Sequence, residues 1–497
     1  MSGTFFGFNT ALKGLFAQQK AMNTTAHNIA NAGTEGYTRQ QAVMEATPAF
    51  AVPSMSRPGG SGQVGTGVNV NEIRRIRDVF LDTQIRNELA GLGEWEQKSE
   101  TLRLAETVFI EPSDDGLSSI FDEFWKGWQE LSKNAENIPI RTSLKETAIS
   151  LADAIKHSYN QLNTVVTDLK RTAEIKALAV NTLATQINDL NQQIATIQLS
   201  GDSPNDLKDQ RDNLLDKLAR LIDFTPEDTT VERPVGVTKN PDGTFDVAMG
   251  HVPDGQIRIY MGDPATKIED RKEQDYLVYA QPNKFQTIAY SEADKEFKWM
   301  EDASTVPPTL GDTFPVFTGE LFGLMEVMAQ IEEYISDLNE LAENLATAVN
   351  EKHLNGVDLD GQQGEQFFYF DSGNAAGTIK VNAEITKDVT KIAASIDSAG
   401  GHDGGVALEI AKLRPGIDRQ YDQLVSRIGV KTNEAIKRRQ GQEVLLGQLE
   451  SRKESISGVS LDEEMAFMMQ YQRAYQAAAT IITTLDEMVQ TILALKR

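Results

Sequence analysis

The chain of 497 residues contains no cysteine. This absence excludes disulfide bonds, thiolate zinc sites and cysteine nucleophiles, and it leaves the cellular compartment open. Histidine is also scarce, because the five histidines lie in separate segments and form no H-E-x-x-H pair. No serine lies in a nucleophile-elbow string. The sequence therefore predicts no catalytic residues and no metal site, and we expect a protein that is not an enzyme.

Positive charge is in short supply as well. The 48 Lys and Arg residues stand against 73 Asp and Glu residues, which gives a formal net charge of −25. An acidic surface repels nucleic acids and anionic membranes, so neither is an expected partner. No apolar run reaches the roughly 18 residues that a membrane span requires. The first residues show neither a basic leader nor a cleavage site, so we expect no cleaved signal peptide, and secretion would need another route.

Two short strings resemble ligand-binding motifs but lack the required context. Gly60-x-Gly62-x-x-Gly65 matches the dinucleotide fingerprint, yet prolines precede it and a strand-like segment follows it. We therefore expect no cofactor there. Asp358-Leu-Asp360-Gly361 matches part of a calcium loop without its remaining ligands, so this segment is predicted to be a turn.

Each end of the chain has the pattern of an amphipathic helix. Large apolar residues recur at alternating steps of three and four, and the first helix is expected to run to about Asn31. A capping box at Ser460–Glu463 is predicted to start the last helix. An isolated amphipathic helix is marginal in water. We therefore expect the two helices to form a coiled coil with each other and then with neighbouring copies, and to be mobile in the free monomer.

Between the two ends, the sequence predicts a mainly α fold with inserted β domains. One long helix is expected from about Pro139 to Leu199, roughly 90 Å in length, and Ser203 is predicted to cap the next helix in a capping box with Asp206. The apolar seams at 162–197 and 327–348 are expected to be core. Alternating runs predict strands at 256–261, 275–280 and 285–290, and shorter ones at 367–370 and 378–381.

These patterns suggest a nested domain organisation. Residues 1–33 and 456–497 are predicted to form the coiled-coil assembly domain. Between the two ends, we expect a long-helix bundle from 34–223, 319–354 and 406–455, with an extended or β segment at 34–73. The proline-rich stretch 225–318 is the expected inserted β domain, and 355–405 a small β excursion.

One polar motif follows the first helix. It reads Asn28-Ile29-Ala-Asn31-x-x-Thr34-x-Gly36-Tyr37 and continues into Thr38-Arg39-Gln40. Small residues let the helix end, Gly36 permits an unusual backbone angle, and Tyr37 supplies an aromatic anchor. The alternative is a plain turn from helix to strand.

This motif resembles the N-terminal signature of bacterial flagellar rod, hook and hook-associated proteins. The segment Gly458-Val-Ser-Leu-Asp-Glu-Glu-Met465, with Tyr471–Tyr475 and Ile482–Met488, resembles their C-terminal signature. The internal Ser203-Pro-Asn-Asp-Leu-Lys-Asp-Gln-Arg-Asp212 narrows the resemblance to the members between hook and filament. Two residues depart from the pattern: Ser460 stands where asparagine is usual, and Phe467 where a polar residue is more common.

The resemblance implies a self-assembling structural subunit of the extracellular flagellum. It implies type III export without cleavage, a chaperone on the C-terminal segment, and a ring of identical subunits between hook protein and the adjoining hook-associated protein and flagellin. A hook or rod subunit, or a secreted adhesin or enzyme carried by the β insert, are the alternatives. The expected assembly residues are Phe8, Leu12, Leu15, Met22, Asn28, Ile29, Asn31, Thr34, Gly36, Tyr37, Arg39, Leu461, Met468, Tyr471, Tyr475, Ile482, Leu485, Val489 and Ile492.

Overall fold

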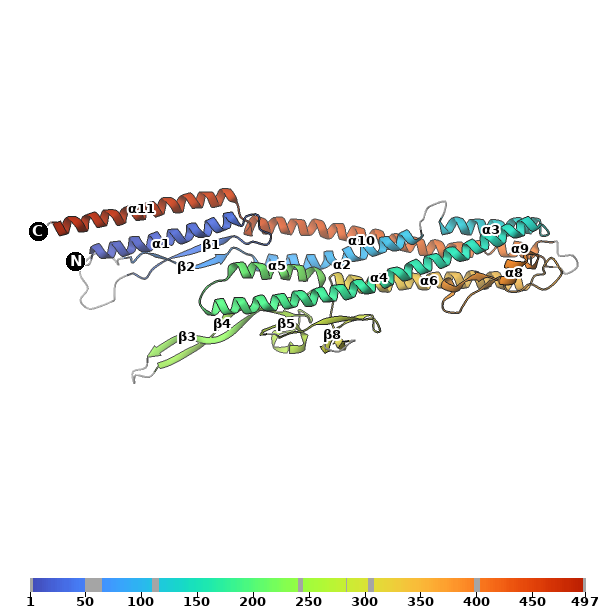
Figure 1. Cartoon of the computed structure of the whole chain (residues 1–497), viewed down its shortest axis with the longest axis horizontal. Coiled ribbons are helices and arrows are strands. Elements are labelled where there is room, and N and C mark those ends of the chain that lie inside the picture. Colours follow the sequence, from blue (N-terminus) through green and yellow to red (C-terminus); the bar gives the residue numbers. More distant parts are fainter. Residues whose placement is uncertain are drawn as a thin grey trace.

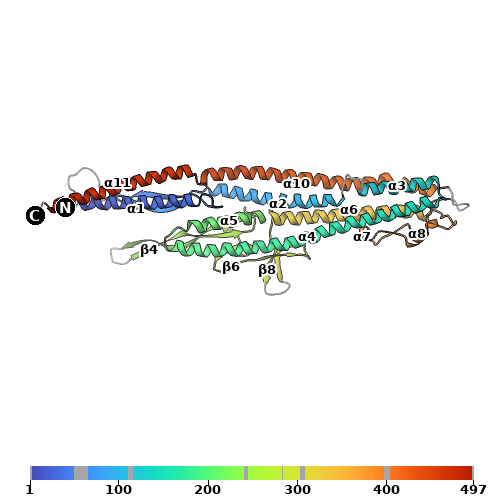
Figure 2. The ribbon, with the colours of Figure 1, turned by 45° about the horizontal axis from the view of Figure 1, so that its top comes forward.

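The computed structural model is a long rod of helices with small β-sheets along one side (Figure 1). It describes residues 3–49, 65–109, 116–239, 245–282, 284–302, 308–396 and 403–494. The Gly60–Gly65 string lies outside these residues except for Gly65 itself. Both ends of the chain lie together at one end of the rod. The sheets of residues 225–313 lie beside helix α4 (Ile138–Leu199), away from helix α10 (Arg414–Ser457) (Figures 1 and 2). The predicted fold class, mainly helical with inserted β structure, is confirmed.

One end of the rod is a terminal arm, the name used here for two helices and a β-hairpin. Its elements are α1 (Gly3–Ala30), β1 (Gln40–Ala46), β2 (Val68–Arg75) and α11 (Leu461–Ala494). Strands β1 and β2 are antiparallel, with Gln40 opposite Arg75. The first helix therefore ends within one residue of its expected end, and α11 begins directly after Ser460 as expected.

The body of the rod is a bundle of long helices. The longest, α4, has 62 residues and begins after Asn137, whose side chain accepts a hydrogen bond from Ile140 N. Pro139 lies in its first turn, where the absent N–H costs nothing. The predicted long helix is confirmed, and most residues of both seams are buried. The bundle helices are α2 (Val79–Phe109), α3 (Leu117–Lys133), α4 (Ile138–Leu199), α5 (Asn205–Leu221), α6 (Glu320–Leu354) and α10 (Arg414–Ser457).

The expected capping serine of α5 is wrong. The helix begins at Asn205, and its N-cap residue, Pro204, makes no side-chain cap. The Ser203 hydroxyl instead donates to Asn205 Oδ1 at 3.1 Å. Asp206 does not fold back to form a capping box, because its carboxylate accepts a hydrogen bond from Gln40 Nε2 at 2.7 Å. A long-range contact has replaced the local one.

The region between α5 and α6 forms two antiparallel sheets, with strand orders β3-β4-β5-β6 and β7-β8-β9. The strands expected at 256–261 and 275–280 are confirmed within β4 and β5. The single strand expected at 285–290 is wrong, because the chain leaves one sheet after Phe285 and enters the other at Ile288. The strands are β3 (Thr225–Lys239), β4 (Phe245–Tyr260), β5 (Tyr276–Gln281), β6 (Lys284–Phe285), β7 (Ile288–Ser291), β8 (Glu296–Asp302) and β9 (Thr309–Thr313).

Buried asparagines of α4 hold these sheets against the bundle. The Asn181 side chain accepts from Ile288 N and donates to Ile288 O, both at 2.8 Å. Asn191 pairs in the same way with Ile257, at 3.1 and 2.8 Å. Each amide thus satisfies the peptide groups of one strand residue, as a neighbouring strand would. Apolar residues of both sheets, Ile257 and Ile288 among them, belong to the same core cluster as the bundle.

The segment between α6 and α10 contains more helix than expected. Its only strands in the described part are the two-residue pair β10 and β11, and Thr378 ends a helix instead of starting a strand. Asp358 forms the predicted turn, since its Oδ1 accepts from Asp360 N at 3.0 Å and Gln362 N at 2.7 Å. The elements are β10 (Phe368–Tyr369), α7 (Ala375–Thr378), β11 (Lys380–Val381), α8 (Ala383–Lys387) and α9 (Gly405–Ala411).

Candidate assembly site

The two helices of the terminal arm run antiparallel to each other (Figures 1 and 2). Near the chain ends, a Cβ added at Gly7 would lie 3.6 Å from Leu485 Cδ1, so the α1 backbone touches the Leu485 side chain. At the opposite end, Asn28 Nδ2 donates to Glu464 Oε2 at 3.1 Å. The expected pairing of the terminal helices is therefore confirmed within one chain.

This pairing covers the expected assembly residues only in part. Phe8 and Leu461 are 37% and 50% exposed, and the side chain of Ile492 lies outside the described residues. The other large side chains of the seam are half-buried. They are Leu12, Leu15, Met22, Ile29, Met468, Tyr471, Tyr475, Ile482, Leu485 and Val489.

The fully buried side of α1 consists of small residues that the sequence analysis missed. Ala17, Ala21 and Thr25 are at most 4% exposed. Their spacing of four residues marks one side of a helix, and this was the available signal. Small side chains let the hairpin come close, and Gly67, just before β2, lies near the α1 backbone at Thr10. The apolar seam expected from the sequence, with its steps of three and four, follows other positions of the helix.

Asn28 is the centre of a polar cluster at the base of the arm. Its Oδ1 accepts from Gln40 N at 3.0 Å and from the Tyr37 hydroxyl at 2.8 Å. Its Nδ2 donates to Gln40 O at 2.8 Å and to Glu464 at 3.1 Å. All four hydrogen-bonding positions of the amide are used. We call Asn28, Tyr37, Arg39, Gln40 and Glu464 the root cluster.

Arg39 joins the root cluster to the start of α11. Its Nε lies 2.7 Å from Glu464 Oε1, and its Nη1 lies 3.1 Å from Glu463 Oε2. The Glu464 side chain is only 3% exposed, so Arg39 provides its main ionic contact in place of water. The guanidinium also lies 5.7 Å from the ring centre of Phe467. The unusual residue Phe467 therefore packs on Arg39 in the same chain.

The rest of the motif ends α1 and turns the chain into β1. Asn31 Nδ2 donates to His27 O at 3.0 Å, and Thr34 Oγ1 donates to Asn31 Oδ1 at 3.2 Å. Gly36 has a φ of 77° and lies against Asn213 of α5. Such an angle favours glycine. The segment is more than a plain turn, because its side chains reach both α5 and α11.

Burial governs the ionisation of Tyr37. Loss of water raises the pKa of the Tyr37 hydroxyl, and the carboxylates of Asp206, Asp209 and Glu464 raise it further. The hydroxyl therefore keeps its proton at neutral pH and remains the donor to Asn28.

The arm also has apolar side chains that its internal contacts leave exposed. On α11, Met469, Ile481 and Met488 are 52–56% exposed, and Leu493 is 62% exposed. Phe16 of α1 is 59% exposed. Several large apolar side chains left exposed on one helix are typical of a protein-binding surface.

Metal-binding groups and membrane-spanning helices are both absent from the described part of the chain. No group of three His, Asp or Glu side chains is placed there to hold a metal ion. Among the described helices, none combines the length and hydropathy that a membrane crossing demands. His27 lies 3.3 Å from Asp206, in a contact between α1 and α5.

Three protein-family models match this chain. Residues 102–368, more than half of the chain, match the "Flagellar hook-associated protein FlgK helical domain". Residues 8–38 match "Flagella basal body rod protein", and 453–495 match "Flagellar basal body rod FlgEFG protein C-terminal". The two rod-protein matches coincide with the arm, and the first covers much of the bundle and the sheets.

Full-length relatives agree with these matches. Flagellar hook-associated protein 1 of Bacillus subtilis (strain 168) is 32% identical and covers 99% of this chain and 98% of its own length. The protein of the same name from Escherichia coli (strain K12) is 25% identical and covers 98% of both chains.

The solved structure of the flagellar hook junction protein FlgK from Burkholderia pseudomallei matches with 19% identity and a TM-score of 0.44, over 58% of this chain and 47% of that chain.

The arm and the bundle together define a structural flagellar protein of the rod, hook and hook-associated class. Within this class, the match over residues 102–368 distinguishes hook-associated proteins from rod and hook subunits. The chain belongs to the flagellar hook-associated protein 1 family.

Proposed function

We propose that this chain is a structural subunit of the junction between flagellar hook and filament, without catalytic activity, and that it assembles through the terminal arm. The observation that carries the proposal is the exposed apolar surface of α11 beside its contact with α1. Copies of the same chain, arranged in a ring, would cover this surface from both sides. Hook protein would lie on one side of the ring, and the adjoining hook-associated protein and flagellin on the other.

The proposed assembly residues act in two ways. The half-buried seam of α1 and α11, with Phe8 and Leu461, contacts neighbouring arms. The root cluster, together with Asn31, Thr34 and Gly36, holds the arm in the shape that neighbours recognise. Hydrogen bonds from Asn28 and Arg39 to Glu464 support this division, because they link the ends of both helices.

Export is a second part of the proposal. We place the subunit outside the cell, delivered by the flagellar type III apparatus without removal of a leader. A chaperone would hold the C-terminal segment before secretion, since an amphipathic helix with exposed Met and Ile side chains invites aggregation. Intact mass measurement of the secreted protein tests the absence of cleavage. Chaperone binding is tested by co-purification of the full chain and of a chain ending at residue 460.

Removal of residues 461–497 tests the assembly role. The truncated chain should keep a folded bundle, measured by circular dichroism, and should fail to enter the junction, measured by electron microscopy of purified flagella. Filaments that still grow on this variant would refute the proposal.

A double substitution tests the exposed apolar surface of α11 without removing the helix. Met469→Asp with Ile481→Asp places two charges on exposed apolar positions of α11, and incorporation should fall at least tenfold with unchanged helicity. Thr480→Asp, at another exposed position of the same helix, is the matched control and should be incorporated normally. Equal incorporation of both variants would contradict the proposal.

A further inference from the structure

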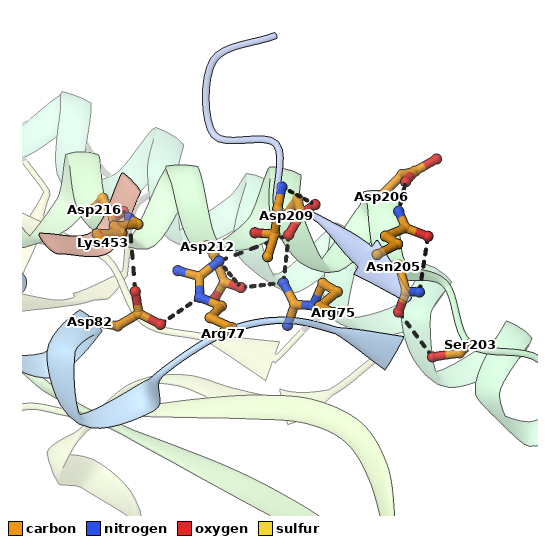
Figure 3. Close-up of polar contacts among 12 residues, drawn as sticks. Arg75, Arg77, Asp82, Ser203, Asn205, Asp206, Asp209, Asp212, Asp216 and Lys453 are labelled. Carbon is orange, nitrogen blue, oxygen red and sulfur yellow. Dashed lines mark hydrogen bonds and ion pairs between the residues drawn. The ribbon is translucent and has the colours of Figure 1, made fainter. Parts of the chain in front are cut away.

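One side of helix α5 is polar and faces the terminal arm. Asn205, Asp209, Asp212 and Asp216 recur at steps of four, three and four, which places them on one helix face. At the start of this face, Asn205 Nδ2 donates to Ile73 O at 2.8 Å. Figure 3 shows the row along α5, with the segment after β2 opposite it. We call Asn205, Asp206, Asp209, Asp212 and Asp216 the α5 row.

The first part of the α5 row holds the chain between α1 and β1. Asp206 accepts from Gln40 Nε2 at 2.7 Å, and Asp209 Oδ2 accepts from Thr38 N at 3.0 Å. Gln40 and Thr38 adjoin Arg39 of the root cluster. The two clusters are therefore continuous, and the α5 row fixes the root cluster to the bundle.

In the middle of the row, Asp212 forms ion pairs with three arginines. Asp212 Oδ2 lies 2.6 Å from Arg75 Nη1 and 2.9 Å from Arg77 Nη1, and Asp212 Oδ1 lies 3.4 Å from Arg86 Nη2. Arg75 also contacts Asp209 at 2.8 Å. Burial alone would raise the pKa of Asp212, but the three arginines outweigh burial and hold it below its ordinary value. Asp212 is thus charged at neutral pH.

The last part of the row reaches the end of α10. Asp216 lies 2.8 Å from Arg86 Nε and 3.3 Å from Lys453 Nζ. Lys453 also lies 3.8 Å from Asp82, which pairs with Arg77 at 2.5 Å. Figure 3 shows Lys453, Asp82, Arg77 and Asp212 as a connected series.

These contacts surround both covalent connections between arm and bundle. The chain crosses between them twice, between β2 and α2 and between α10 and α11. Arg75 and Arg77 lie at the first crossing, and Lys453 lies one turn before the second. Short crossings alone leave two rigid bodies free to rotate relative to each other. The α5 row holds the arm side of the first crossing directly. At the second crossing it fixes the end of α10, where Ser457 O accepts a hydrogen bond from Arg39 N of the arm at 3.0 Å.

Because these ion pairs are buried, they depend strongly on the relative position of their partners. The side chains of Arg77, Asp209 and Asp212 are 9%, 6% and 10% exposed. Exposed ion pairs contribute little, whereas removal of one partner from a buried pair leaves a charge without compensation. A network of this kind favours one relative orientation over neighbouring ones.

We propose that the α5 row is the positioning element that fixes the angle between terminal arm and bundle, so that every subunit enters the assembly in the same shape. The consequence for assembly rests on the proposed function. The fixed angle itself is a property of the single chain and is measured on the monomer. This proposal departs from the mobile terminal helices that the sequence analysis expects for the free monomer.

The absence of cysteine makes a direct measurement possible, since two introduced cysteines are the only labelling sites. We call the place where the terminal arm meets the bundle the joint. Spin labels at Thr484 on α11 and Gln193 on α4, both exposed, report the distance across it. Labels at Asn9 and Thr484 report the shape of the arm alone. In the parent chain, electron–electron resonance should give one narrow distance distribution for each pair.

The test variant is Asp212→Asn, which removes one charge among three arginines. The distribution across the joint should become at least twice as wide, while the distribution within the arm and the helicity stay unchanged. The conservative variant Asp212→Glu should restore a narrow distribution. Glu320→Gln is the matched control, because Glu320 pairs with Arg220 and Lys176 of the bundle and has no link to the arm.

Two results overturn the proposal. One is a narrow distribution across the joint in Asp212→Asn with native helicity. The other is equal broadening in Glu320→Gln, which would indicate general loosening. If Asp212→Asn fails to fold, the neutral variant Asn205→Ala replaces it under the same criteria.

Failure of the joint and failure of the proposed function remain distinguishable. If the Asp212→Asn distribution broadens but the variant is still incorporated at the parent level, the α5 row does fix the angle in the monomer. In that case the fixed angle has no role in assembly. A narrow distribution in Asp212→Asn, combined with loss of incorporation in Met469→Asp with Ile481→Asp, supports the assembly surface and overturns the joint.

Discussion

Asn28 pairs through its side-chain amide with both backbone groups of Gln40, accepting at 3.0 Å and donating at 2.8 Å. The same pairing joins Asn181 to Ile288. In each case a helix takes the place of a neighbouring strand and satisfies a strand residue that would otherwise be left unpaired. The hairpin of the arm and the sheet that contains β7 are thus attached to helices in the same way.

Replacement of Asn28 by alanine tests the root cluster. Asn28→Ala leaves the N–H and C=O of Gln40 without partners in a buried place, and Tyr37 loses its acceptor. Each unsatisfied buried group costs about 1–3 kcal/mol, so the free energy of unfolding should fall by about 3 kcal/mol in urea titration. Asn9→Ala, at an exposed position of the same helix, should change it by less than about 0.5 kcal/mol. Equal effects of the two variants would show that Asn28 is not a stabilising centre.

The pair between Arg39 and Glu464 should be strongly coupled. Arg39→Gln leaves Glu464, whose side chain is 3% exposed, without its cation, and should cost about 3 kcal/mol. In a double-mutant cycle with Glu464→Gln, the second change should recover part of this loss, with a coupling of about 2 kcal/mol.

The exposed pair Arg171–Asp168 provides the control for this cycle. Its side chains are 74% and 66% exposed, so Arg171→Gln should change stability by less than about 0.5 kcal/mol. A coupling near zero between Arg39 and Glu464 would mean that their contact adds no more than an exposed pair.

Acid should destabilise the bundle through His353. Burial lowers the pKa of His353 from 6.5 to about 4, and Nε2 accepts from Ala393 N at 2.8 Å, so the folded state holds a neutral ring. The unfolded chain takes up a proton below its pKa of 6.5. The contribution of His353 is therefore complete above pH 6.5 and is lost as pH falls towards 4, by about 3 kcal/mol in total.

Urea unfolding at pH 7 and at pH 4.5 measures this loss. His353→Gln cannot take up the proton, so its stability should depend less on pH than that of the parent chain. Parallel pH profiles for the two proteins would contradict the assignment.

Strongly periodic segments could be predicted from the sequence. The start of α4 was expected at about Pro139, a residue that the first turn of a helix accepts, and the structure confirms it. Pairing of α1 with α11 follows from two apolar seams without other partners. These features depend on helix period and capping, which adjacent residues determine.

Features that depend on distant residues could not be predicted. Asp206 has the sequence position of a capping carboxylate, yet it binds Gln40, 166 residues away. The break between Phe285 and Ile288 divides a run that the sequence predicts as one strand, because Ile288 pairs with Asn181 of α4. The α5 row was visible as a motif, but nothing local showed that Asp212 would meet three arginines.

Asn28 and Glu464 are 436 positions apart in the chain and adjacent in the folded arm. Synthesis must therefore reach residue 464 before the first helix can find its partner. A polypeptide that stops early lacks the Glu464 acceptor of Asn28 Nδ2, and its first helix has no α11 to pair with. Because the arm is the proposed contact with neighbouring copies, we expect prematurely terminated chains to be left out of the assembly.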